Sequence, residues 1–568
     1  MPSHERLLTD TLRATRGWIA LYAASSVASA ATALLIPVTL ATAADAVLTR
    51  SSGAMPLVLM AALTAAAALA TATGEIAEVK ASSGATAHLR HRLLRHVLAW
   101  DLRGQRLFPT GDLLSRLLQS TAESARLVPA VGGGLVSALT SLGGVVALFL
   151  IDPATGLTFL CGAPAIWLIA KAFFRRSTAL TEDYQRVHGE LATRFQGAIR
   201  GHLTIRAAAS ADREAARILA PMPRLRACGL AFFHAQRSAG WQVSLIAPVL
   251  QVGVLATAGY GVSAGRVSPG GLVAVSGYLT LAYGLFQQIS VLASLGQVHG
   301  SARRLHEVFA VPAAARANAG VPPGPAALRL SGVHVSDGGQ PALDGVDLDV
   351  PAGGCVAVVG ASGAGKSTLA AVAGGLLRPD AGTVALNGVD MAEVAPDVLG
   401  SEVAYAFEHP ELLGTTVRDA IGYGGRPVGE ASIAAALQHS AAADFVARLP
   451  LRLDTPLAGL RLSGGEFQRL GLARAFSRDA RLLILDDATS SVDTMTEQLI
   501  AKALHTQRVT RLVVTHREAT AARADLVLWL EHGTVAGFGP HRELLKLPGY
   551  AALYAREANR CQTEAATS

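Results

Sequence analysis

Six long apolar stretches fill the first half of the chain and constrain its fold more than any other feature. They run over residues of roughly 19–47, 55–78, 128–151, 153–174, 240–263 and 270–295. A helix needs about 20 apolar residues to cross about 30 Å of hydrocarbon, and it satisfies its own backbone hydrogen bonds there. The stretches are rich in Ala, Gly and Ser, which lets helices pack closely in lipid. We therefore predict six membrane-spanning helices.

Charge sets the orientation of these spans. The connections within span pairs one–two, three–four and five–six carry only Arg50, Asp152 and Arg266. The other connections, residues 79–127 and 171–237, hold many Arg and some Lys, and both ends of the span region are basic. Lys and Arg collect on cytoplasmic loops, so we expect a multi-pass protein of the inner (plasma) membrane with both termini cytoplasmic. The formal net charge of +7 then requires no nucleic-acid partner.

The two long connections show apolar residues at helical spacing, so we expect two helical hairpins that extend into the cytoplasm. A break at 108–111 predicts a short cross-helix at the first hairpin tip. Residues 311–326 are Pro, Ala and Gly with little periodicity, which indicates a linker. The expected organisation is a membrane domain over 1–310, this linker, and a second domain over 327–568.

Few polar side chains lie within the spans. Among them, away from the span ends, are Gln242, Gln251, Tyr278, Tyr283, Gln287 and Gln288. No Asp, Glu, Lys or Arg lies at mid-span, so no proton relay or ion site is indicated. Gln251, Tyr283 and Gln287 either line a cavity or tie one helix to another.

After the linker, strands and helices alternate, which predicts an α/β domain. A buried-strand run, CVAVVG, leads into a complete phosphate-loop motif, G-x-x-x-x-G-K-[ST]. Its residues are Gly360, Ala361, Ser362, Gly363, Ala364, Gly365, Lys366, Ser367 and Thr368. In such a loop the backbone N–H groups surround phosphates, the lysine reaches the outer phosphates, and the hydroxyl of Ser367 holds Mg²⁺.

Three further residues accompany this loop. Asp486 ends the strand LLILD and is the expected second anchor for Mg²⁺. Asp487 follows it, where a catalytic base or water-positioning carboxylate is needed. His516 follows the strand LVVT and is placed to contact the γ-phosphate, although a lone His is usually structural. A Ser-Gly-Gly turn, Ser463–Gly465, opens a helix and offers its N-terminus to phosphate.

These motifs together resemble the ATP-binding cassette (ABC) transporters. The segments 360–368, LSGGE at 462–466, LLILDDATSSVD at 482–493 and VVTH at 513–516 match that family in order and spacing. With six spans first, the chain resembles an exporter-type half-transporter: an all-α membrane domain fused to an α/β P-loop nucleotide-binding domain. The resemblance implies ATP and Mg²⁺ as cofactors, and coupling helices at hairpin tips near 104–111 and 206–216.

The resemblance also implies a partner. Two cassettes would dimerise head to tail, with each ATP between the phosphate loop of one and the signature of the other. The residues implied at the partner's ATP are Ser463, Gly464, Gly465, Glu466 and Asp493.

The chain departs from the family pattern at several positions. The aromatic residue that stacks on adenine should lie near 333–337, where the sequence is VHVSD. Glu408 stands where the family has its Q-loop glutamine, and we expect it to approach Mg²⁺ and to take part in catalysis. The segment before the signature is short. Asp487 stands where the family has its catalytic glutamate, and its side chain is one methylene shorter. A catalytic carboxylate misplaced by about 1 Å can lower the rate about 100-fold.

The sequence therefore predicts an ATP-driven exporter half that pairs with a second, different half-transporter and hydrolyses its own ATP slowly. Two alternatives remain: an importer with the exporter fold, and an ATP-binding regulatory or gating subunit. The cargo, a small molecule or peptide, is not specified by the residues.

Overall fold

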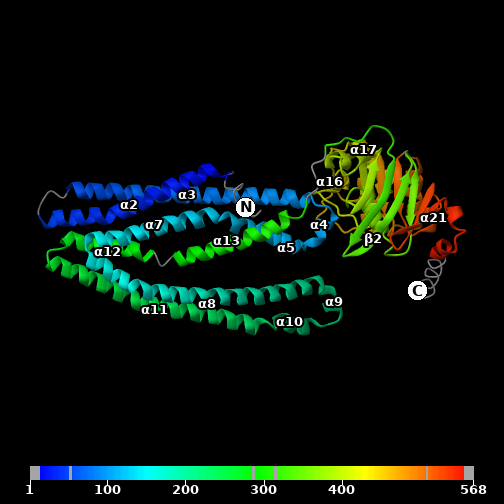
Figure 1. The fold of residues 1–568 in the computed structure, drawn as a ribbon. Coiled ribbons are helices and arrows are strands. Elements are labelled where there is room, and N and C mark those ends of the chain that lie inside the picture. The colour runs from blue at the N-terminus through cyan, green and yellow to red at the C-terminus, as the bar shows by residue number, and fades with distance from the viewer. Residues whose placement is uncertain are drawn as a thin grey trace. The chain divides into compact units, whose positions relative to one another are not determined.

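The computed structural model describes residues 13, 15–49, 54–284, 288–312, 318–506 and 509–554. The chain divides into two compact units (Figure 1). The first comprises Met1–Leu98 and Pro109–Val311, and the second comprises Ala99–Phe108 and Pro312–Ser568. A ten-residue segment from the first predicted hairpin thus belongs to the second unit.

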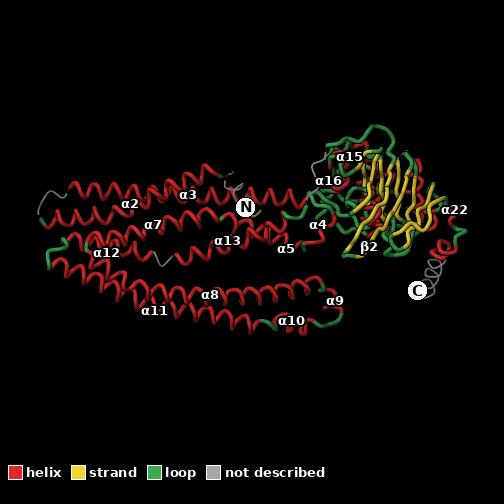
Figure 2. The backbone as a smooth tube through the Cα atoms, viewed as in Figure 1, coloured by secondary structure: helices red, strands yellow, loops and turns green. Residues whose placement is uncertain are grey.

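The described part of the first unit is helical throughout (Figure 2). Its long helices are α2 (Arg16–Leu48), α3 (Ala54–Leu98), α7 (Leu127–Ile151), α8 (Pro153–Arg200), α11 (Met222–Ser263), α12 (Pro269–Tyr283) and α13 (Gln288–Phe309). Its short helices are α5 (Thr110–Ser115), η1 (Arg116–Ser120), α6 (Thr121–Ala125), α9 (His202–Ala207) and α10 (Ala211–Leu219). Helices α8 and α12 begin at Asp-Pro and Ser-Pro pairs, whose side chains cap the first turn.

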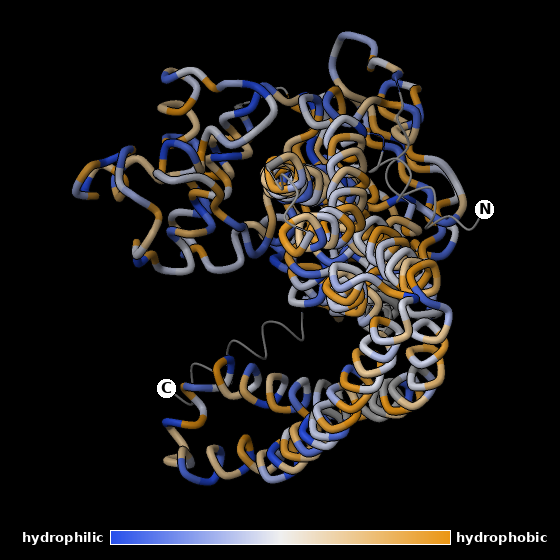
Figure 3. The backbone as a smooth tube through the Cα atoms, turned by 90° about the vertical axis from the view of Figure 1, so that its left-hand side faces the viewer, coloured by the Kyte–Doolittle hydropathy of each residue, from blue (hydrophilic) through white to orange (hydrophobic). Residues whose placement is uncertain are grey.

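Four described helical stretches are long and apolar enough to cross a membrane: Arg16–Leu48, Met55–Leu98, Thr110–Ile151 and Ser244–Ser263. The apolar part of α8, Pro153–Ile169, is shorter. The sixth predicted span is not one described helix, because α12 ends at Tyr283 and α13 begins at Gln288. Residues 285–287 between them lie outside the described part. Figure 3 shows apolar residues along the long helices of this unit.

Small residues sit where these helices meet, as the composition predicts. A Cβ on Gly144 would lie 3.0 Å from the carbonyl oxygen of Tyr278. The tyrosines tie helices together: the Tyr278 hydroxyl donates to Leu34 O at 2.7 Å, and the Tyr283 hydroxyl donates to Ala247 O at 2.8 Å. For Tyr283, the alternatives were a cavity lining and a link between helices, and the hydrogen bond to Ala247 is a link between helices. Gln242 and Gln251 are exposed, and the side chains of Gln287 and Gln288 are not described.

The second unit holds two sheets. The first has the order β2-β1-β4-β5 and is antiparallel, with strands β1 (Leu328–Asp337), β2 (Gln340–Val350), β4 (Ala381–Leu386) and β5 (Val389–Asp390). The second has the order β10-β9-β3-β8-β7-β6, with strands β3 (Cys355–Val359), β6 (Val403–Ala406), β7 (Leu482–Asp486), β8 (Thr510–Val514), β9 (Leu526–Glu531) and β10 (Thr534–Gly539). All its pairs are parallel except β9–β10.

Helices accompany both sheets in this unit. They are α4 (Leu102–Leu107), α14 (Lys366–Ala373), α15 (Pro396–Glu402), α16 (Val417–Ile421), α17 (Glu430–His439), α18 (Ala443–Arg448), η3 (Arg452–Asp454), α19 (Gly464–Phe476), α20 (Thr494–Thr506), α21 (Glu518–Ala521) and α22 (His541–Leu544).

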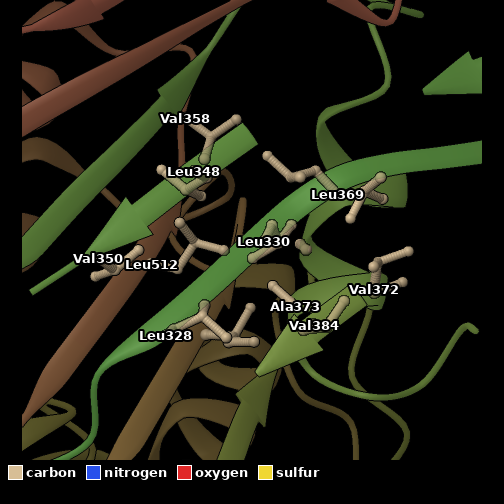
Figure 4. Close-up of a cluster of buried hydrophobic side chains, with 14 of the residues drawn as sticks. Leu328, Leu330, Leu348, Val350, Val358, Leu369, Val372, Ala373, Val384 and Leu512 are labelled. Atoms are coloured by element: carbon tan, nitrogen blue, oxygen red, sulfur yellow. The ribbon is translucent and has the colours of Figure 1, made fainter. Parts of the chain in front are cut away.

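The core of the second unit lies between the two sheets and holds α14 in place. Leu330 of β1, Val358 of β3 and Leu512 of β8 are buried in one cluster with Leu369 and Val372 of α14 (Figure 4). Full burial of such a side chain contributes about 1.5–3 kcal/mol. The strands β3, β7 and β8 are parallel, so their carboxyl ends meet at one edge of the sheet. The residues after these strands form the candidate site.

Candidate functional site

The phosphate loop joins β3 to α14 through backbone that only glycine fits. Gly360 has φ +156° and Gly365 has φ +97°. A Cβ on Gly360 would lie 2.2 Å from the carbonyl oxygen of Leu530, and one on Gly365 would lie 2.4 Å from that of Ala342. The loop is therefore pressed against neighbouring backbone, while Ala361, Ser362 and Gly363 remain exposed.

Lys366 is the first residue of α14, and its side chain turns back into the loop. Its ammonium donates to Gly360 O at 3.0 Å and to Ala361 O at 2.9 Å. The residue is only 6% exposed, and this burial lowers the pKa of the ammonium, while the nearby charges of Asp487 and Asp486 act in the opposite direction. A buried ammonium at the N-terminus of a helix favours an anion.

Asp486 ends β7 and forms the centre of a short hydrogen-bonded chain. The Ser367 hydroxyl donates to its Oδ1 at 3.0 Å, and the Tyr405 hydroxyl donates to its Oδ2 at 3.0 Å. Burial raises the pKa of the Asp486 carboxyl, and the two hydrogen bonds oppose that shift. Burial also raises the pKa of the Tyr405 hydroxyl.

A hydroxyl beside a carboxylate suits Mg²⁺, which prefers oxygen ligands and uses few protein side chains when phosphates and water supply the rest. Ser367 and Asp486 form such a pair. Among the described residues, no group of three or more His, Cys, Asp or Glu side chains could hold a metal ion. The Ser367–Asp486 pair itself fits a magnesium ion whose other ligands come from a nucleotide and water.

Asp487 and His516, predicted as catalytic partners, lie together. Asp487 has φ +46°, a left-handed conformation that Asp tolerates better than most residues, and its N–H donates to Val514 O at 3.2 Å. Its Oδ2 is 3.4 Å from Nε2 of His516, which follows β8. The side chain of His516 is 49% exposed, so the imidazole faces the open side of the site.

Glu408 follows β6, near but outside this chain of contacts. Its carboxylate lies 3.9 Å from Nε2 of His409, and its backbone carbonyl accepts from Gln468 at 2.9 Å. Its charge is one of the smaller contributions that raise the pKa of Asp486, after burial. The structure thus joins Ser367 to Asp486 directly and places Glu408 in their neighbourhood.

The signature turn opens α19 with a complete capping box. The Ser463 hydroxyl accepts from the Glu466 N–H at 3.3 Å, and the Glu466 carboxylate accepts from the Ser463 N–H at 2.9 Å. That backbone hydrogen bond lowers the pKa of Glu466. Ser463 and Gly464 are exposed. Asp493 immediately precedes α20, and its Oδ1 accepts from the Thr496 N–H at 2.9 Å.

Gln468 connects the signature to the other motifs, and the sequence analysis missed it. It is 3% exposed, and its amide donates to Glu408 O at 2.9 Å and to Ser490 Oγ at 2.7 Å. Its Oε1 accepts from the Ser491 N–H at 2.8 Å. Tyr405 was missed too. Tyr405 is a single polar residue in an apolar run, whereas Gln468 lies between Phe467 and Arg469, and for both only the buried hydrogen bonds would have marked them.

Comparison with known proteins identifies the class of this chain. The ABC transporter family matches residues 343–490, and the ABC transporter transmembrane region matches residues 19–286. The chain is 40% identical over 532 residues to the ABC transporter ATP-binding protein RamA of Streptomyces coelicolor, covering 93% of this chain and 84% of that protein. The chain therefore belongs to the ABC transporter family.

Two further relatives define its type. An ATM1-type heavy metal exporter of Novosphingobium aromaticivorans is 30% identical over 565 residues, covering 93% of this chain and 90% of that protein. The structure of a bacterial Atm1-family ABC exporter with ATP bound superposes with a TM-score of 0.79 at 26% identity, covering 96% and 98% of the two chains. The chain is an exporter-type half-transporter, a multi-pass membrane protein with a fused ATP-binding domain. The fold class predicted from the sequence is confirmed.

Proposed function

We propose that this chain is the slowly hydrolysing half of an ATP-driven exporter, paired with a second half-transporter of different sequence. The observation that carries the proposal is Asp487. It stands where the family has glutamate, and its carboxylate is already 3.4 Å from His516. The shorter side chain holds its carboxylate closer to its own backbone than a glutamate would. A general base placed about 1 Å from its productive position loses about 100-fold in rate.

The phosphate-binding part of the site keeps its motif complete. We propose that residues Gly360 to Thr368 surround the phosphates of ATP, with Lys366 at the outer phosphates. Ser367 and Asp486 would hold Mg²⁺, which offsets the phosphate charge, and Glu408 would approach it from the loop after β6. His516 would contact the γ-phosphate while Asp487 orients the attacking water. The chain would then bind MgATP well and cleave it slowly.

The signature supports the second half of the proposal. LSGGE is intact, and its first turn is exposed and already shaped by the capping box. We propose that Ser463, Gly464, Gly465, Glu466 and Asp493 complete the ATP site of the partner. This chain would thereby hydrolyse its own ATP slowly, while its signature completes the active ATP site of the partner. Export out of the cytoplasm, across the plasma membrane with both termini inside, follows from the charge distribution and from the exporter type.

Names of relatives favour export over the alternatives. Besides the heavy metal exporter, an ATP-dependent lipid A-core flippase of Chromohalobacter salexigens is 41% identical over 236 residues, 40% of each chain. That likeness covers less than half of either chain, so it does not carry the cargo of the flippase over to this chain. The two named cargoes differ chemically, and we propose only a small molecule or peptide.

The test is co-purification with ATPase measurement. The chain is tagged and expressed alone and together with a neighbouring half-transporter, and each preparation is assayed with and without Asp487→Asn. We expect slow turnover alone, fast turnover in the pair, and little effect of Asp487→Asn on the pair. Asp349→Asn, on the outer strand β2, is the matched control. Fast turnover by the chain alone that Asp487→Asn abolishes would refute the slow-site proposal. ATP binding with no ATPase in any pair would favour the regulatory subunit.

A further inference from the structure

Two arginines of α4 lie beside the nucleotide site, within the second compact unit. The helix is anchored by Leu102, whose N–H donates to Leu376 O at 3.2 Å and whose side chain packs against the core cluster. Arg103 pairs with Asp380, just before β4, and Arg106 pairs with Asp337, the last residue of β1. Two ion pairs thus join α4 to the ends of two strands of the antiparallel sheet.

A cavity of about 230 Å³ runs from these ion pairs to the phosphate end of the site. Arg103, Arg106 and Asp337 line one part, and Ser367, Thr368 and Asp486 line another. A nucleotide whose phosphates lie on the loop would place its sugar and base toward the arginines. The cavity is therefore shaped to receive the other end of the same ligand.

The aromatic rings that line this cavity are already engaged. Tyr405 and Phe407 stack on each other with ring centroids 4.3 Å apart, and the Tyr405 hydroxyl is held by Asp486. The end of β1 supplies no aromatic ring: His334 faces the other side, where its Nδ1 lies 3.2 Å from the Gly345 N–H and 2.9 Å from Asp344. A base bound here must use another flat surface.

Arginine supplies such a surface. The guanidinium is planar and stacks on aromatic rings, with cation–π attraction added. Arg103 also has donors to spare: its Nε and Nη2 are buried and have no acceptor within the part of the chain that the structure describes. Buried donors without acceptors are costly, so a ligand carrying hydroxyl or ring-nitrogen acceptors would relieve that cost.

We propose that Arg106, held by Asp337, takes the place of the missing aromatic residue as the surface on which the nucleobase stacks, while Arg103 donates to the sugar or base. This inference rests on the proposed binding of ATP at the phosphate loop. The base contact then belongs to a helix of the hairpin between two membrane spans. Nucleotide binding and the position of α4 are then coupled through the side chains of Arg106 and Arg103.

The test compares ATP with inorganic tripolyphosphate, which has the phosphates but no base. Binding is measured on the full chain in detergent for Arg106→Ala and for Arg106→Lys, which keeps the charge but loses the plane. Arg106→Ala should weaken ATP binding about 3- to 30-fold, the range expected for loss of a cation–π contact. Arg106→Lys should weaken it less, because an ammonium keeps the charge but cannot stack. Both variants should leave tripolyphosphate binding unchanged. Retained tripolyphosphate binding also shows that the variants are folded.

Controls separate this inference from the proposed function. Arg329→Ala, which breaks a similar ion pair with Asp349 on the same sheet but outside the cavity, should change neither affinity. Lys366→Ala should weaken both ligands. Equal loss of ATP and tripolyphosphate in Arg106→Ala, unchanged ATP affinity in that variant, or full ATP affinity in Arg106→Lys would each overturn the base surface alone. A wild-type chain that binds neither ligand would contradict the proposed function itself.

Discussion

The phosphate loop and the signature turn are both helix N-termini in one domain, yet they are built in opposite ways. At the phosphate loop, Lys366 is buried and turned into its own loop, and a cavity lies beside Ser367 and Asp486. At the signature, Ser463 and Gly464 are exposed, and the first-turn N–H of Glu466 is satisfied by the chain's own serine. The first is concave, and the second is an exposed, preformed turn, which we propose completes the ATP site of a partner chain.

The largest expected effect is the loss of ATP binding when the lysine of the phosphate loop is removed. Lys366→Ala should weaken ATP binding by about 100-fold or more, because charge-assisted hydrogen bonds contribute about 1.5–3 kcal/mol each. Equilibrium binding of ATP to the purified chain measures this loss. Lys502→Ala, at an exposed lysine of α20, is the matched control and should bind normally. Normal ATP affinity in Lys366→Ala would show that the phosphate loop is not the binding site.

The next prediction tests the proposal that Asp487 makes ATP hydrolysis by this chain slow. Asp487→Glu should raise the ATPase rate of the chain alone by about 10- to 100-fold, because the longer side chain places its carboxylate where the family has it. Steady-state phosphate release measures the rate, and the affinity for ATP should stay within about threefold, since the carboxylate is not expected to bind the ground state more tightly. An unchanged rate would mean that another group limits hydrolysis.

Much of the architecture could be predicted because its signals are periodic or local. The apolar stretches predicted the helical membrane domain, and strand–loop–helix order predicted the α/β domain. The sixth predicted span, 270–295, stays a prediction, because α12 ends at Tyr283, α13 begins at Gln288, and residues 285–287 lie outside the described part of the chain.

The site was harder to predict, because its supporting contacts join residues far apart in the chain. The motif residues after β3, β7 and β8 converge because parallel strands share an edge, and that convergence could be foreseen. The bonds of Tyr405 to Asp486 and of Gln468 to Glu408 could not, since neither residue belongs to a recognised pattern. The left-handed backbone conformation of Asp487 could not be predicted from the sequence either.

Gln468 links the signature helix α19 to the loops after β6 and β7, and its removal tests how much this link stabilises the domain. Gln468→Ala should lower the free energy of unfolding of the second unit by about 1–3 kcal/mol, because it removes the buried Gln468 amide and leaves the Ser491 N–H and the Glu408 carbonyl, both in part-buried hydrogen bonds, without this partner. Chemical or thermal unfolding of the purified chain measures the change. Gln498→Ala, at an exposed position of α20, should have no effect. Equal stability of the two variants would show that water replaces the amide.

A smaller effect is expected at the signature cap. Ser463→Ala should lower the free energy of unfolding by about 1 kcal/mol, the usual contribution of an N-cap hydroxyl. It should leave the affinity of this chain for ATP unchanged, because the exposed turn does not line its own cavity. Ser432→Ala, an exposed serine inside α17, is the control and should not destabilise. A loss of this chain's own ATP affinity in Ser463→Ala would erase the distinction between the two halves.

The smallest effect is a dependence on pH at the other member of the cap. The pKa of Glu466 is lowered in the folded chain, first by the hydrogen bond from the Ser463 N–H, so the ionised form stabilises the fold. The sign follows from linkage: this stability is present above the unfolded pKa of glutamate and is lost as pH falls through the lowered folded value. Glu466→Gln keeps the acceptor but cannot ionise, so the stability difference between wild type and variant should shrink between neutral pH and the acid side of the glutamate range. Unfolding midpoints of both chains over that range measure it. A difference that stays constant with pH would show that the cap stabilises through geometry alone, with no part for its charge.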